Sequence, residues 1–404
     1  MSSIRARSAL AGATALLLAV SLTACDAGSA LPGAEDDEPT AGVSGSAEPP
    51  TATAGRLQAN VRARASDVPV DRVLAVRATD ARITQVEVVS EAGAVAGEVS
   101  GDGSTWTASD LLEPGTSYTL SARAEGADGE SLERTARFTT QDLTLDEQTY
   151  PSVAPLDGET VGVGMPVVVT FDVPVTDRAS IEQHLAVTSS PQQAGTWHWL
   201  SDTEVHWRPQ EYWQAGTDVT VDIDINSVPA GAGVYGQESR QVAFHVGDAN
   251  IYKVNARTHQ MQVFSNGEKL RTIPITTGEQ PDFTTRSGTK VIMEKFESRD
   301  MNSETVGITG ADAYNIAGVK WAMRLTNSGE FIHAAPWSVA SQGHANVSHG
   351  CTGMSTEDAG WLFARSKRGD VVEYVGTDRP MTLDNGYGDW NASFADYRAG
   401  SALT

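Results

Sequence analysis

Residues 347–355 read VSHGCTGMS and contain one of only two cysteines in a chain of 404 residues. A cysteine becomes a strong nucleophile when a nearby histidine cation or the N-terminus of a helix favours its thiolate. Cys351 has His349 two residues before it, and His333 ends an earlier strand-like run, EFIHAAPW. The order of strand, long loop, cysteine and helix start predicts a nucleophile in this loop, with a buried inert cysteine as the alternative.

A helix is predicted directly after the loop. Ser355 is the expected N-cap, because Asp358 stands three residues further on. The apolar stripe of this helix is formed by Ala359, Leu362 and Phe363. Gly369 stands where the helix is expected to end, and the run DVVEYV after it is typical of a strand. Since the field of a helix end fades within one turn, histidine should be the main influence on Cys351.

The histidines near the cysteine are not equivalent candidates for the base. Residues two apart share a side only on an extended backbone, and Gly350 disfavours that conformation between His349 and Cys351. His333 is held on a strand and brought round by the loop SQGHANV, which also contains His344. We expect His333 to act as the base and to keep the thiolate ionised, while His349 shapes the loop through hydrogen bonds. Gly350 lacks a Cβ where backbone N–H groups would approach an oxyanion.

The composition indicates a folded chain and argues against nucleic-acid binding. Apolar residues make up 40% of the sequence, enough for the cores of two or three domains. The formal net charge of -23 would repel phosphate and anionic surfaces, so we expect no nucleic-acid partner. A neutral or zwitterionic partner fits better, unless the acidity serves solubility alone.

The N-terminus has the pattern of an export signal. Arg5 and Arg7 precede an apolar run, residues 9–20, that is too short to span a bilayer, and Leu-Thr-Ala-Cys follows at 22–25. This last motif resembles the bacterial lipobox, in which cleavage precedes a cysteine that receives a lipid. We therefore expect a signal peptide over 1–24, lipidation of Cys25 and an extracytoplasmic chain anchored to the membrane. An ordinary signal peptide with an incidental cysteine is the alternative.

The cysteine count supports the catalytic interpretation. Lipidation of Cys25 would leave Cys351 without an internal disulfide partner, in a compartment where disulfides are common. An unpaired thiol there is exposed to oxidation, and catalysis is the leading reason to keep one.

Composition and alternation divide the rest of the chain. Residues 25–56 are rich in Gly, Ala, Ser, Pro and acidic residues and are expected to be a flexible linker. Alternating apolar runs predict two immunoglobulin-like β-sandwiches, over 57–141 and 147–247. The two stretches share a spaced pattern, which indicates a duplicated module. The first contains PGTSYTLSA then RTARF, and the second contains AGTDVTVDI then RQVAF. Chance similarity is the alternative.

The second sandwich contains four tryptophans: Trp197, Trp199, Trp207 and Trp213. Two-residue spacing in a hairpin places the first two on one face, so we expect packing in the core or at a domain interface. A carbohydrate-stacking patch is the alternative. No metal site is expected, because these histidines lack ligand spacing: His184, His198, His206 and His245.

The third region, residues 250–378, is expected to be a β-rich domain with one main helix. Asn266 and Gly267 stand between two strand-like runs and are the strongest short signal for a hairpin. Further strands are predicted in SGTKVIMEKF and GEFIHAAPW, and residues 379–404 are expected to form a C-terminal subdomain. The fold class is therefore mainly β, with two sandwiches followed by a catalytic domain.

His333, a loop and then Ser-His-Gly-Cys resemble the signature of the L,D-transpeptidases, a family with the YkuD-type catalytic fold that cross-links bacterial peptidoglycan. The resemblance covers residues 251–376 as the catalytic domain. The upstream part resembles the actinobacterial lipoprotein members with two immunoglobulin-like modules. The run GYGDWNASFADYRAG resembles their C-terminal subdomain.

The resemblance implies a role for each matching residue. Cys351 would be the nucleophile that attacks the amide before the terminal D-Ala of a stem tetrapeptide, His333 the acid and base, and His349 a further residue of the catalytic set. The implied substrate-binding residues are Met301, Tyr314, Ser328, Gly329, Trp337, Ser348, Gly350 and Gly353. The implied partners are donor and acceptor stem peptides of peptidoglycan and carbapenem-type inhibitors, with no cofactor.

Two positions depart from the family's pattern. Gly353 stands where many members have Asn, which affects a substrate contact. Ala334 stands where they have Ser, which matters little if only its backbone carbonyl orients His333. The rival functions are an L,D-carboxypeptidase, another cell-wall cysteine acyltransferase such as a sortase, and a non-catalytic cell-wall-binding lipoprotein. The sortase motif Thr-Leu-x-Thr-Cys is missing.

Overall fold

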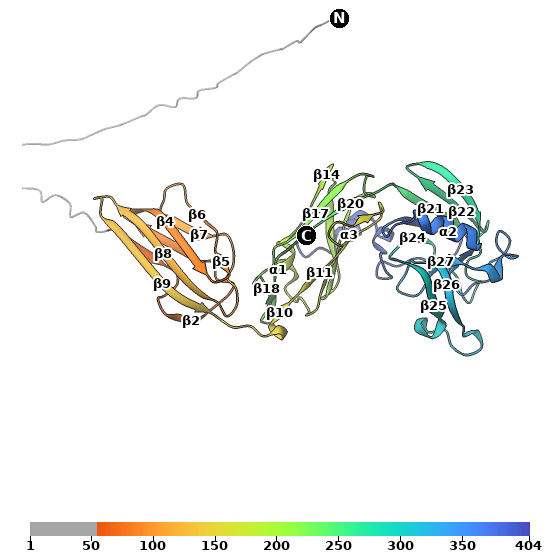
Figure 1. Cartoon of the computed structure of the whole chain (residues 1–404), viewed down its shortest axis with the longest axis horizontal. Helices are drawn as coiled ribbons and strands as arrows, with labels where there is room; N and C mark the ends of the chain where they lie inside the picture. The colour runs from red at the N-terminus through yellow and green to blue at the C-terminus, as the bar shows by residue number, and fades with distance from the viewer. Residues whose placement is uncertain (1–54) are drawn as a thin grey trace, which may run out of the picture. The chain divides into compact units, whose positions relative to one another are not determined.

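The computed structural model describes residues 55–404 (Figure 1). The predicted signal peptide, Cys25 and the linker as far as residue 54 lie outside the described residues, so lipidation stays a prediction. The described part is mainly β, as predicted, and its α-helices are α1 (Arg178–Glu182), α2 (Thr356–Arg365) and α3 (Phe394–Arg398). None of these helices is both long and apolar enough to cross a membrane.

The first sandwich consists of two sheets. One contains, in spatial order, β1 (Arg56–Ala59), β3 (Ala75–Thr79), β7 (Thr105–Ala108) and β6 (Gly97–Val99). The other contains β2 (Ala65–Val68), β9 (Ser131–Thr140), β8 (Ser117–Gly126), β4 (Ala81–Ser90) and β5 (Gly93–Ala94). Alternating apolar side chains meet between the sheets, where Leu74, Leu112 and Leu120 are fully buried.

The second sandwich has the same two-layer construction. One sheet contains β11 (Pro151–Ala154), β13 (Val167–Phe171), β16 (Glu204–Pro209) and β15 (Gly195–Ser201). The other contains β12 (Thr160–Val161), β20 (Arg240–Val246), β17 (Asp218–Ile223) and β14 (Leu185–Ser190). A small sheet of β10 (Gln148–Thr149), β19 (Val234–Gly236) and β18 (Pro229–Gly231) follows the 3₁₀ helix η1 (Leu145–Glu147). All four tryptophans are buried in the core, which confirms the packing interpretation.

The repeated sequence pattern occupies equivalent places in the two sandwiches. Gly115 and Gly216 both have positive φ, 57° and 82°, and each begins the turn into a long central strand. The N–H of Gly115 donates to the carbonyl of Gln141 and that of Gly216 to the carbonyl of Val246, both at 2.8 Å. The strands that follow pair antiparallel in the same way, β8 with β9 and β17 with β20.

The third region contains two sheets. The first consists of β23 (Glu268–Pro274), β22 (Gln260–Ser265), β21 (Asn250–Asn255), β29 (Val371–Val375) and β24 (Gly288–Val291). The second consists of β25 (Glu294–Asn302), β26 (Asn315–Arg324), β27 (Phe331–Ala334) and β28 (Thr352–Met354). Short 3₁₀ helices occupy its loops: η2 (Ser303–Val306), η3 (Gly310–Asp312) and η4 (Pro336–Ser338). The predicted hairpin is confirmed, since Asn266 and Gly267 join β22 to β23 with φ of 48° and 83°.

Helix α2 packs on β26 and β27 and begins where predicted. The N–H of Asp358 donates to Oγ of Ser355 at 3.0 Å, and the predicted stripe faces the core. The helix ends earlier than predicted, at Arg365 and not at Gly369. Ser366 leaves the helical conformation, with ψ of 147°, and the turn that follows is held by the N–H of Lys367 donating to Oδ2 of Asp370 at 2.8 Å.

That turn joins the third region to the second sandwich. The N–H of Gly162 donates to the carbonyl of Arg368, and that of Gly164 to the carbonyl of Gly369, both at 2.8 Å. A Cβ on Gly162 would lie 2.3 Å from the backbone nitrogen of Asp370, so only glycine allows this approach. Val371 is fully buried among the core residues of the second sandwich.

The C-terminal residues also return to the second sandwich. Nδ1 of His198 donates to the carbonyl of Tyr397 at 2.7 Å, and Nδ1 of His206 bonds Oδ1 of Asp389 at 2.9 Å. The elements that carry these residues are η5 (Asp389–Asn391) and α3. The predicted domain boundaries stay predictions, but the segment beyond residue 379 packs against β15.

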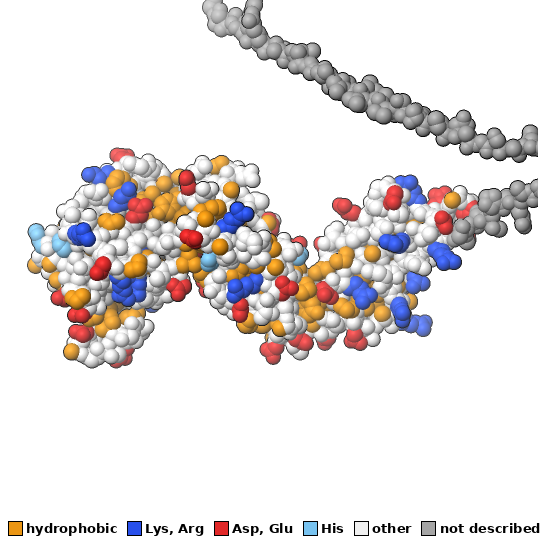
Figure 2. Space-filling view, turned by 180° about the vertical axis from the view of Figure 1, so that it is seen from behind, with side chains coloured by type: hydrophobic (Ala, Val, Ile, Leu, Met, Phe, Trp, Pro, Cys, Tyr) orange, Lys and Arg blue, Asp and Glu red, His pale blue; other side chains and the backbone are white. Residues whose placement is uncertain are grey.

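The visible surface contains charged side chains of both signs. On the face shown in Figure 2, acidic and basic side chains are interspersed and do not gather into a basic patch. Apolar side chains occupy the areas between them.

Candidate active site

A cavity of about 320 Å³ lies beside Cys351. It has the volume of a small-molecule site, on the order of 300–1,000 Å³. Its lining includes eight of the predicted site residues: Met301, Tyr314, His333, Trp337, Ser348, His349, Cys351 and Gly353. Cys351 is 7% exposed, so the sulfur is mostly buried but reached by the cavity.

Strand register brings the cysteine and His333 to the same cavity. Strands β27 and β28 are parallel neighbours, and His333 is paired with Gly353. Cys351 directly precedes β28, so its position is fixed by that strand on one side and by the turn of Ser348, His349 and Gly350 on the other. We call these three residues the SHG turn. Residues far apart in sequence therefore line one cavity because a sheet fixes their spacing.

The His333 ring is oriented by a backbone carbonyl. Its Nδ1 donates to the carbonyl of Ala334 at 2.8 Å, and the Trp337 ring stacks on it with centroids 5.8 Å apart. A carbonyl only accepts, so Nδ1 carries the proton and Nε2 keeps its lone pair. As expected for the Ala334 position, the main chain alone makes this contact, and a Ser hydroxyl is not needed for it.

The expected thiolate is not supported. Burial raises the pKa of the Cys351 thiol to about 12, and the carboxylate of Glu330 adds to this effect. Burial also lowers the pKa of His333 below its usual 6.5. Both groups are therefore neutral near pH 7, because each is buried away from water and a charge there would have no sufficient counter-charge.

The SHG turn is held by its own hydrogen bonds. Oγ of Ser348 donates to the carbonyl of Cys351 at 2.6 Å and accepts the N–H of Gly350 at 3.2 Å. Gly350 has φ of 123°, a conformation that side chains rarely adopt. The His349 ring packs between Phe283 and Tyr314, with centroids 4.3 and 4.9 Å away. The His349 ring is therefore held by packing and not by the hydrogen bonds expected for it, and the side-chain hydrogen bonds of the turn come from Ser348.

Other predicted residues lie beside the cavity. Gly329 does not line it, but its carbonyl accepts from the Cys351 thiol at 3.6 Å. The Ser328 hydroxyl accepts from Nδ2 of Asn385 at 3.0 Å and so faces the C-terminal segment. His344 lies in the same loop as the cysteine but outside the cavity lining. Among residues 55–404, no group of His, Cys, Asp and Glu side chains has the arrangement of a metal site.

Comparison with known proteins explains this arrangement. A model of the L,D-transpeptidase catalytic domain matches residues 249–373, and one of a bacterial Ig domain matches residues 65–229. L,D-transpeptidase 2 of Mycobacterium tuberculosis (strain CDC 1551 / Oshkosh) is 36% identical over 351 residues, covering 86% of this chain and 85% of that protein. The chain belongs to the L,D-transpeptidase family.

Further members are also similar to this transpeptidase chain. L,D-transpeptidase 5 of Mycobacterium tuberculosis (strain ATCC 25618 / H37Rv) is 34% identical and covers 84% of this chain and 75% of its own. The solved structure of the LD transpeptidase LdtMt1 in complex with imipenem is 38% identical, with a TM-score of 0.49, and covers 55% of this chain and 97% of that chain.

Gly353, the residue expected to depart from the family's pattern, is closely packed in this transpeptidase. Gly353 and Thr276 exchange two backbone hydrogen bonds of 2.9 Å. A Cβ at Gly353 would lie 2.8 Å from Cβ of Ala335 and 3.1 Å from Cγ2 of Thr276. A larger residue therefore needs a shift of the neighbouring backbone.

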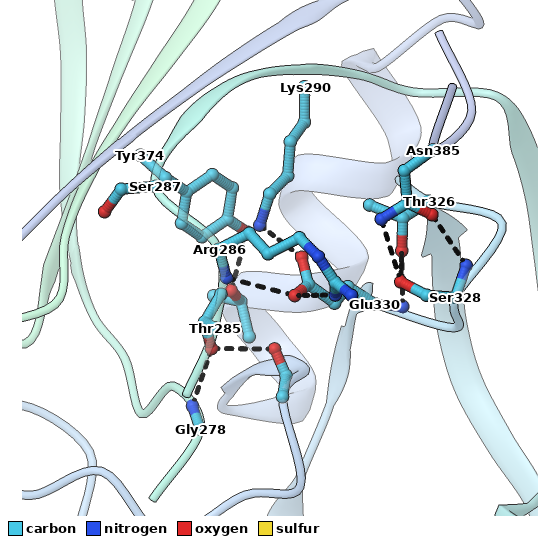
Figure 3. A network of polar contacts seen from close by, with 12 residues as sticks. Gly278, Thr285, Arg286, Ser287, Lys290, Thr326, Ser328, Glu330, Tyr374 and Asn385 are labelled. Atoms are coloured by element: carbon cyan, nitrogen blue, oxygen red, sulfur yellow. Dashed lines mark hydrogen bonds and ion pairs between the residues drawn. The ribbon is translucent and has the colours of Figure 1, made fainter. Parts of the chain in front are cut away.

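Pattern and spacing do not reveal a charged cluster behind the cysteine of this transpeptidase. Lys290 lies on β24, Arg286 precedes that strand, and Glu330 precedes β27; their side chains point toward one another (Figure 3). In the sequence, the cluster is marked only by a lysine inside the apolar run TKVIM and by a glutamate directly before FIHAA. Both are ordinary for strand ends, so the cluster becomes visible only in three dimensions.

Proposed function

We propose that this member of the family forms peptidoglycan cross-links through a thioester on Cys351 and releases D-Ala from the donor stem peptide. The observation that carries the proposal is the cavity shared by Cys351 and His333, with Nε2 of His333 unprotonated. His333 lies on β27 and Cys351 directly precedes its parallel neighbour β28, so a nucleophile and a base are held beside one cavity, as acyl transfer requires.

Acylation would begin with a neutral pair. As the Cys351 sulfur bonds to the carbonyl carbon before the terminal D-Ala, the thiol proton passes to Nε2 of His333. The C–N bond then breaks, and the amine of D-Ala leaves with that proton. Backbone N–H groups near Cys351 would stabilise the oxyanion, although the N–H of Gly350 is engaged by Ser348 at rest.

Deacylation would repeat the same transfers in reverse order. The side-chain amine of an acceptor stem peptide attacks the thioester carbonyl and gives a proton to His333. The C–S bond breaks, and the proton returns to the sulfur. Water in place of the amine would yield a carboxypeptidase product, so Tyr314 and Met301, which line the cavity, would favour cross-linking by limiting water.

The test is product analysis with purified tetrapeptide stems, comparing wild type with Cys351→Ala. Cross-linked dimers and free D-Ala from the wild type alone support the proposal. Tripeptide monomers without dimers would identify a carboxypeptidase, and no product would favour a non-catalytic binding lipoprotein. A thioester is expected to appear as a mass increase of the protein, lost in Cys351→Ala.

Carbapenems provide a second probe of the nucleophile. The family relative LdtMt1 has been solved with imipenem bound. We expect imipenem to add covalently to Cys351 in a stoichiometric ratio, measured as intact mass.

We propose in addition that Cys25 carries a lipid and places the enzyme outside the cell, facing the wall. Metabolic labelling with a fatty-acid analogue, with Cys25→Ala as control, tests this.

A further inference from the structure

A buried charge cluster lies behind the candidate nucleophile. Lys290 is fully buried, and its Nζ bonds Oε2 of Glu330, which is 4% exposed. Oε1 of the same carboxylate accepts the backbone N–H and Nη1 of Arg286, both at 3.0 Å. We call Lys290, Glu330 and Arg286 the rear cluster (Figure 3).

The rear cluster reaches the backbone before the cysteine. The Cγ of Glu330 lies 3.8 Å from the place where a Cβ on Gly350 would stand. Thr285, next to Arg286 in sequence, donates from Oγ1 to the carbonyl of Gly350 at 2.8 Å and accepts the N–H of Gly278 at 2.8 Å. Movement of the cluster would therefore move the peptide that precedes Cys351.

The rear cluster also reaches the residue after the cysteine. Nζ of Lys290 lies 3.7 Å from the centre of the Tyr374 ring, a distance typical of a cation–π contact. The Tyr374 hydroxyl is 2.6 Å from Oγ1 of Thr352, which follows Cys351 directly. One flank of the nucleophile is thus tied to the cluster through Glu330 and Thr285, and the other through Lys290 and Tyr374.

Stability alone does not explain these charges. Ions taken out of water lose solvation, and well-packed apolar side chains of similar size often stabilise a core as much or more. The cluster contains two cations and one carboxylate, and its electrostatic influence extends to the sulfur: the Glu330 charge raises the pKa of Cys351, and the Lys290 charge lowers it. The same two residues therefore affect the thiol in opposite directions.

Other titratable groups near the sulfur contribute less charge. Burial lowers the pKa of His333, on β27, and raises the pKa values of Tyr314, to about 12, and of Tyr374, on β29, so all three are neutral near pH 7. His349, from the SHG turn, packs against Tyr314. The permanent charges that affect the pKa of Cys351 are those of Glu330 and Lys290. The guanidinium groups of Arg299 and Arg324 lie further out, over the Phe331 ring that packs beside the cysteine.

We propose that Lys290, Glu330 and Arg286 are positioning residues that hold the backbone on both sides of Cys351 and balance the charge behind its sulfur. The inference rests on the proposed role of Cys351 as nucleophile. Burial keeps the thiol protonated at rest; the Glu330 charge adds to this effect and the Lys290 charge opposes it. The protonated thiol is protected from oxidation, because the thiolate is the reactive form. Ionisation then awaits His333 and a bound substrate.

Alkylation of Cys351 in the full-length protein by iodoacetamide tests the charge balance without depending on transpeptidation. Peptide mass analysis separates modification of Cys351 from that of Cys25, the other cysteine of the chain. Glu330→Gln removes the negative charge and should lower the thiol pKa by about one unit. The rate at pH 8 should then rise about threefold, since a larger thiolate fraction is partly offset by weaker intrinsic nucleophilicity. Lys290→Met should slow alkylation by about the same factor. The double variant keeps the net charge of the cluster and should return the rate to that of the wild type.

Matched controls separate electrostatics from folding. Glu159→Gln breaks an ion pair with Arg368 away from the sulfur and should leave the alkylation rate unchanged. If Lys290→Met does not fold, Arg286→Gln takes its place. This variant also removes a positive charge, from a side chain that is 16% exposed, and should likewise slow alkylation. Circular dichroism identifies the folded variants.

Two outcomes would overturn the inference. In the first, folded Glu330→Gln and a folded cation variant, Lys290→Met or Arg286→Gln, change the alkylation rate in the same direction. In the second, these variants change the rate by no more than Glu159→Gln does. Either result would leave the cluster a support of the fold alone. Transpeptidation that survives Cys351→Ala would instead overturn the proposed function, while the alkylation rates would still report on the thiol.

Discussion

The Cys351 thiol and the His333 imidazole are both neutral at rest, because each lies where a charge is poorly solvated. In the reaction proposed above, attack on a carbonyl would therefore require proton transfer from sulfur to Nε2 as the new bond forms. The carbonyl of Ala334 would prepare the ring for this step by holding the proton on Nδ1. Under that proposal, reactivity depends on the orientation of His333 and not on a preformed ion pair.

Loss of the base should be severe. His333→Gln keeps a polar side chain but removes the proton acceptor, so kcat for cross-linking should fall by about 10²–10⁴. The measurement is D-Ala release from tetrapeptide stems. His344→Gln is the matched control, because His344 does not line the cavity. Similar losses in both variants would contradict the assignment of the base.

The pH dependence follows from the same residue. His333 acts only when neutral, and its pKa lies below the usual 6.5, so acylation by imipenem should stay fast at pH 6.5 and decline as the pH falls further. Stopped-flow measurement of imipenem acylation tests this. A rate that declines already between pH 8 and 7 would argue for a base with a raised pKa instead.

Strand β28 shows how one element constrains the site. It is short, and it lies between β27 on one side and the Thr276 backbone on the other. Gly353 is its central residue, and the absence of a side chain there lets the two backbones approach. The close packing of this strand therefore favours glycine at position 353.

Adding a side chain in β28 should destabilise the domain. Gly353→Ala places a Cβ 2.8 Å from that of Ala335, and overpacking of this kind costs about 1–3 kcal/mol. A thermal melt should show a lower midpoint for this variant. Gly101→Ala, where a Cβ would meet nothing within 4 Å, is the control and should melt as the wild type does. Equal midpoints for both variants would show that the strand relaxes freely.

At the level of the whole described chain, the second sandwich is more than a spacer. Its strands bind the turn before β29 and the C-terminal segment, and its core includes Val371. One of these contacts is a buried histidine, His206, which bonds Asp389 at 2.9 Å and Glu204 at 2.8 Å. Burial by itself would lower the pKa of His206, but the two carboxylates outweigh it and raise the pKa to about 9.

Stability should therefore fall at alkaline pH. Since the pKa of His206 is higher in the folded state than its usual 6.5, its contribution is complete below pH 6.5 and is lost as the pH rises through about 9. Thermal midpoints measured at pH 6.5 and pH 9.5 should differ by several degrees. His206→Gln should melt lower at pH 6.5 and show a smaller difference. An unchanged difference in that variant would mean that other groups cause the pH effect.

Truncation should distinguish the two sandwiches. Removing residues 57–141 should leave imipenem acylation nearly unchanged, because the contacts with the third region described above all come from the second sandwich. The thermal midpoint should fall slightly, since the buried Ser227 hydroxyl would lose its hydrogen bond to the carbonyl of Leu112. Extending the deletion to residue 246 would expose the face of Val371, so we expect a lower midpoint and aggregation, measured by melting and light scattering. Equal behaviour of the two truncations would show that the interface is dispensable.

Sequence by itself determined the mainly β class, the family, the hairpin at Asn266-Gly267, the N-cap at Ser355 and the pairing of Cys351 with His333 as candidates. These features depend on neighbouring residues, through turn conformations, capping and alternation, or on a short motif. The tertiary structure decided the protonation of Cys351, the early end of α2, the rear cluster and the attachment of the second sandwich. Each of these depends on burial or on charges contributed by distant strands, and only sheet register brings such groups together.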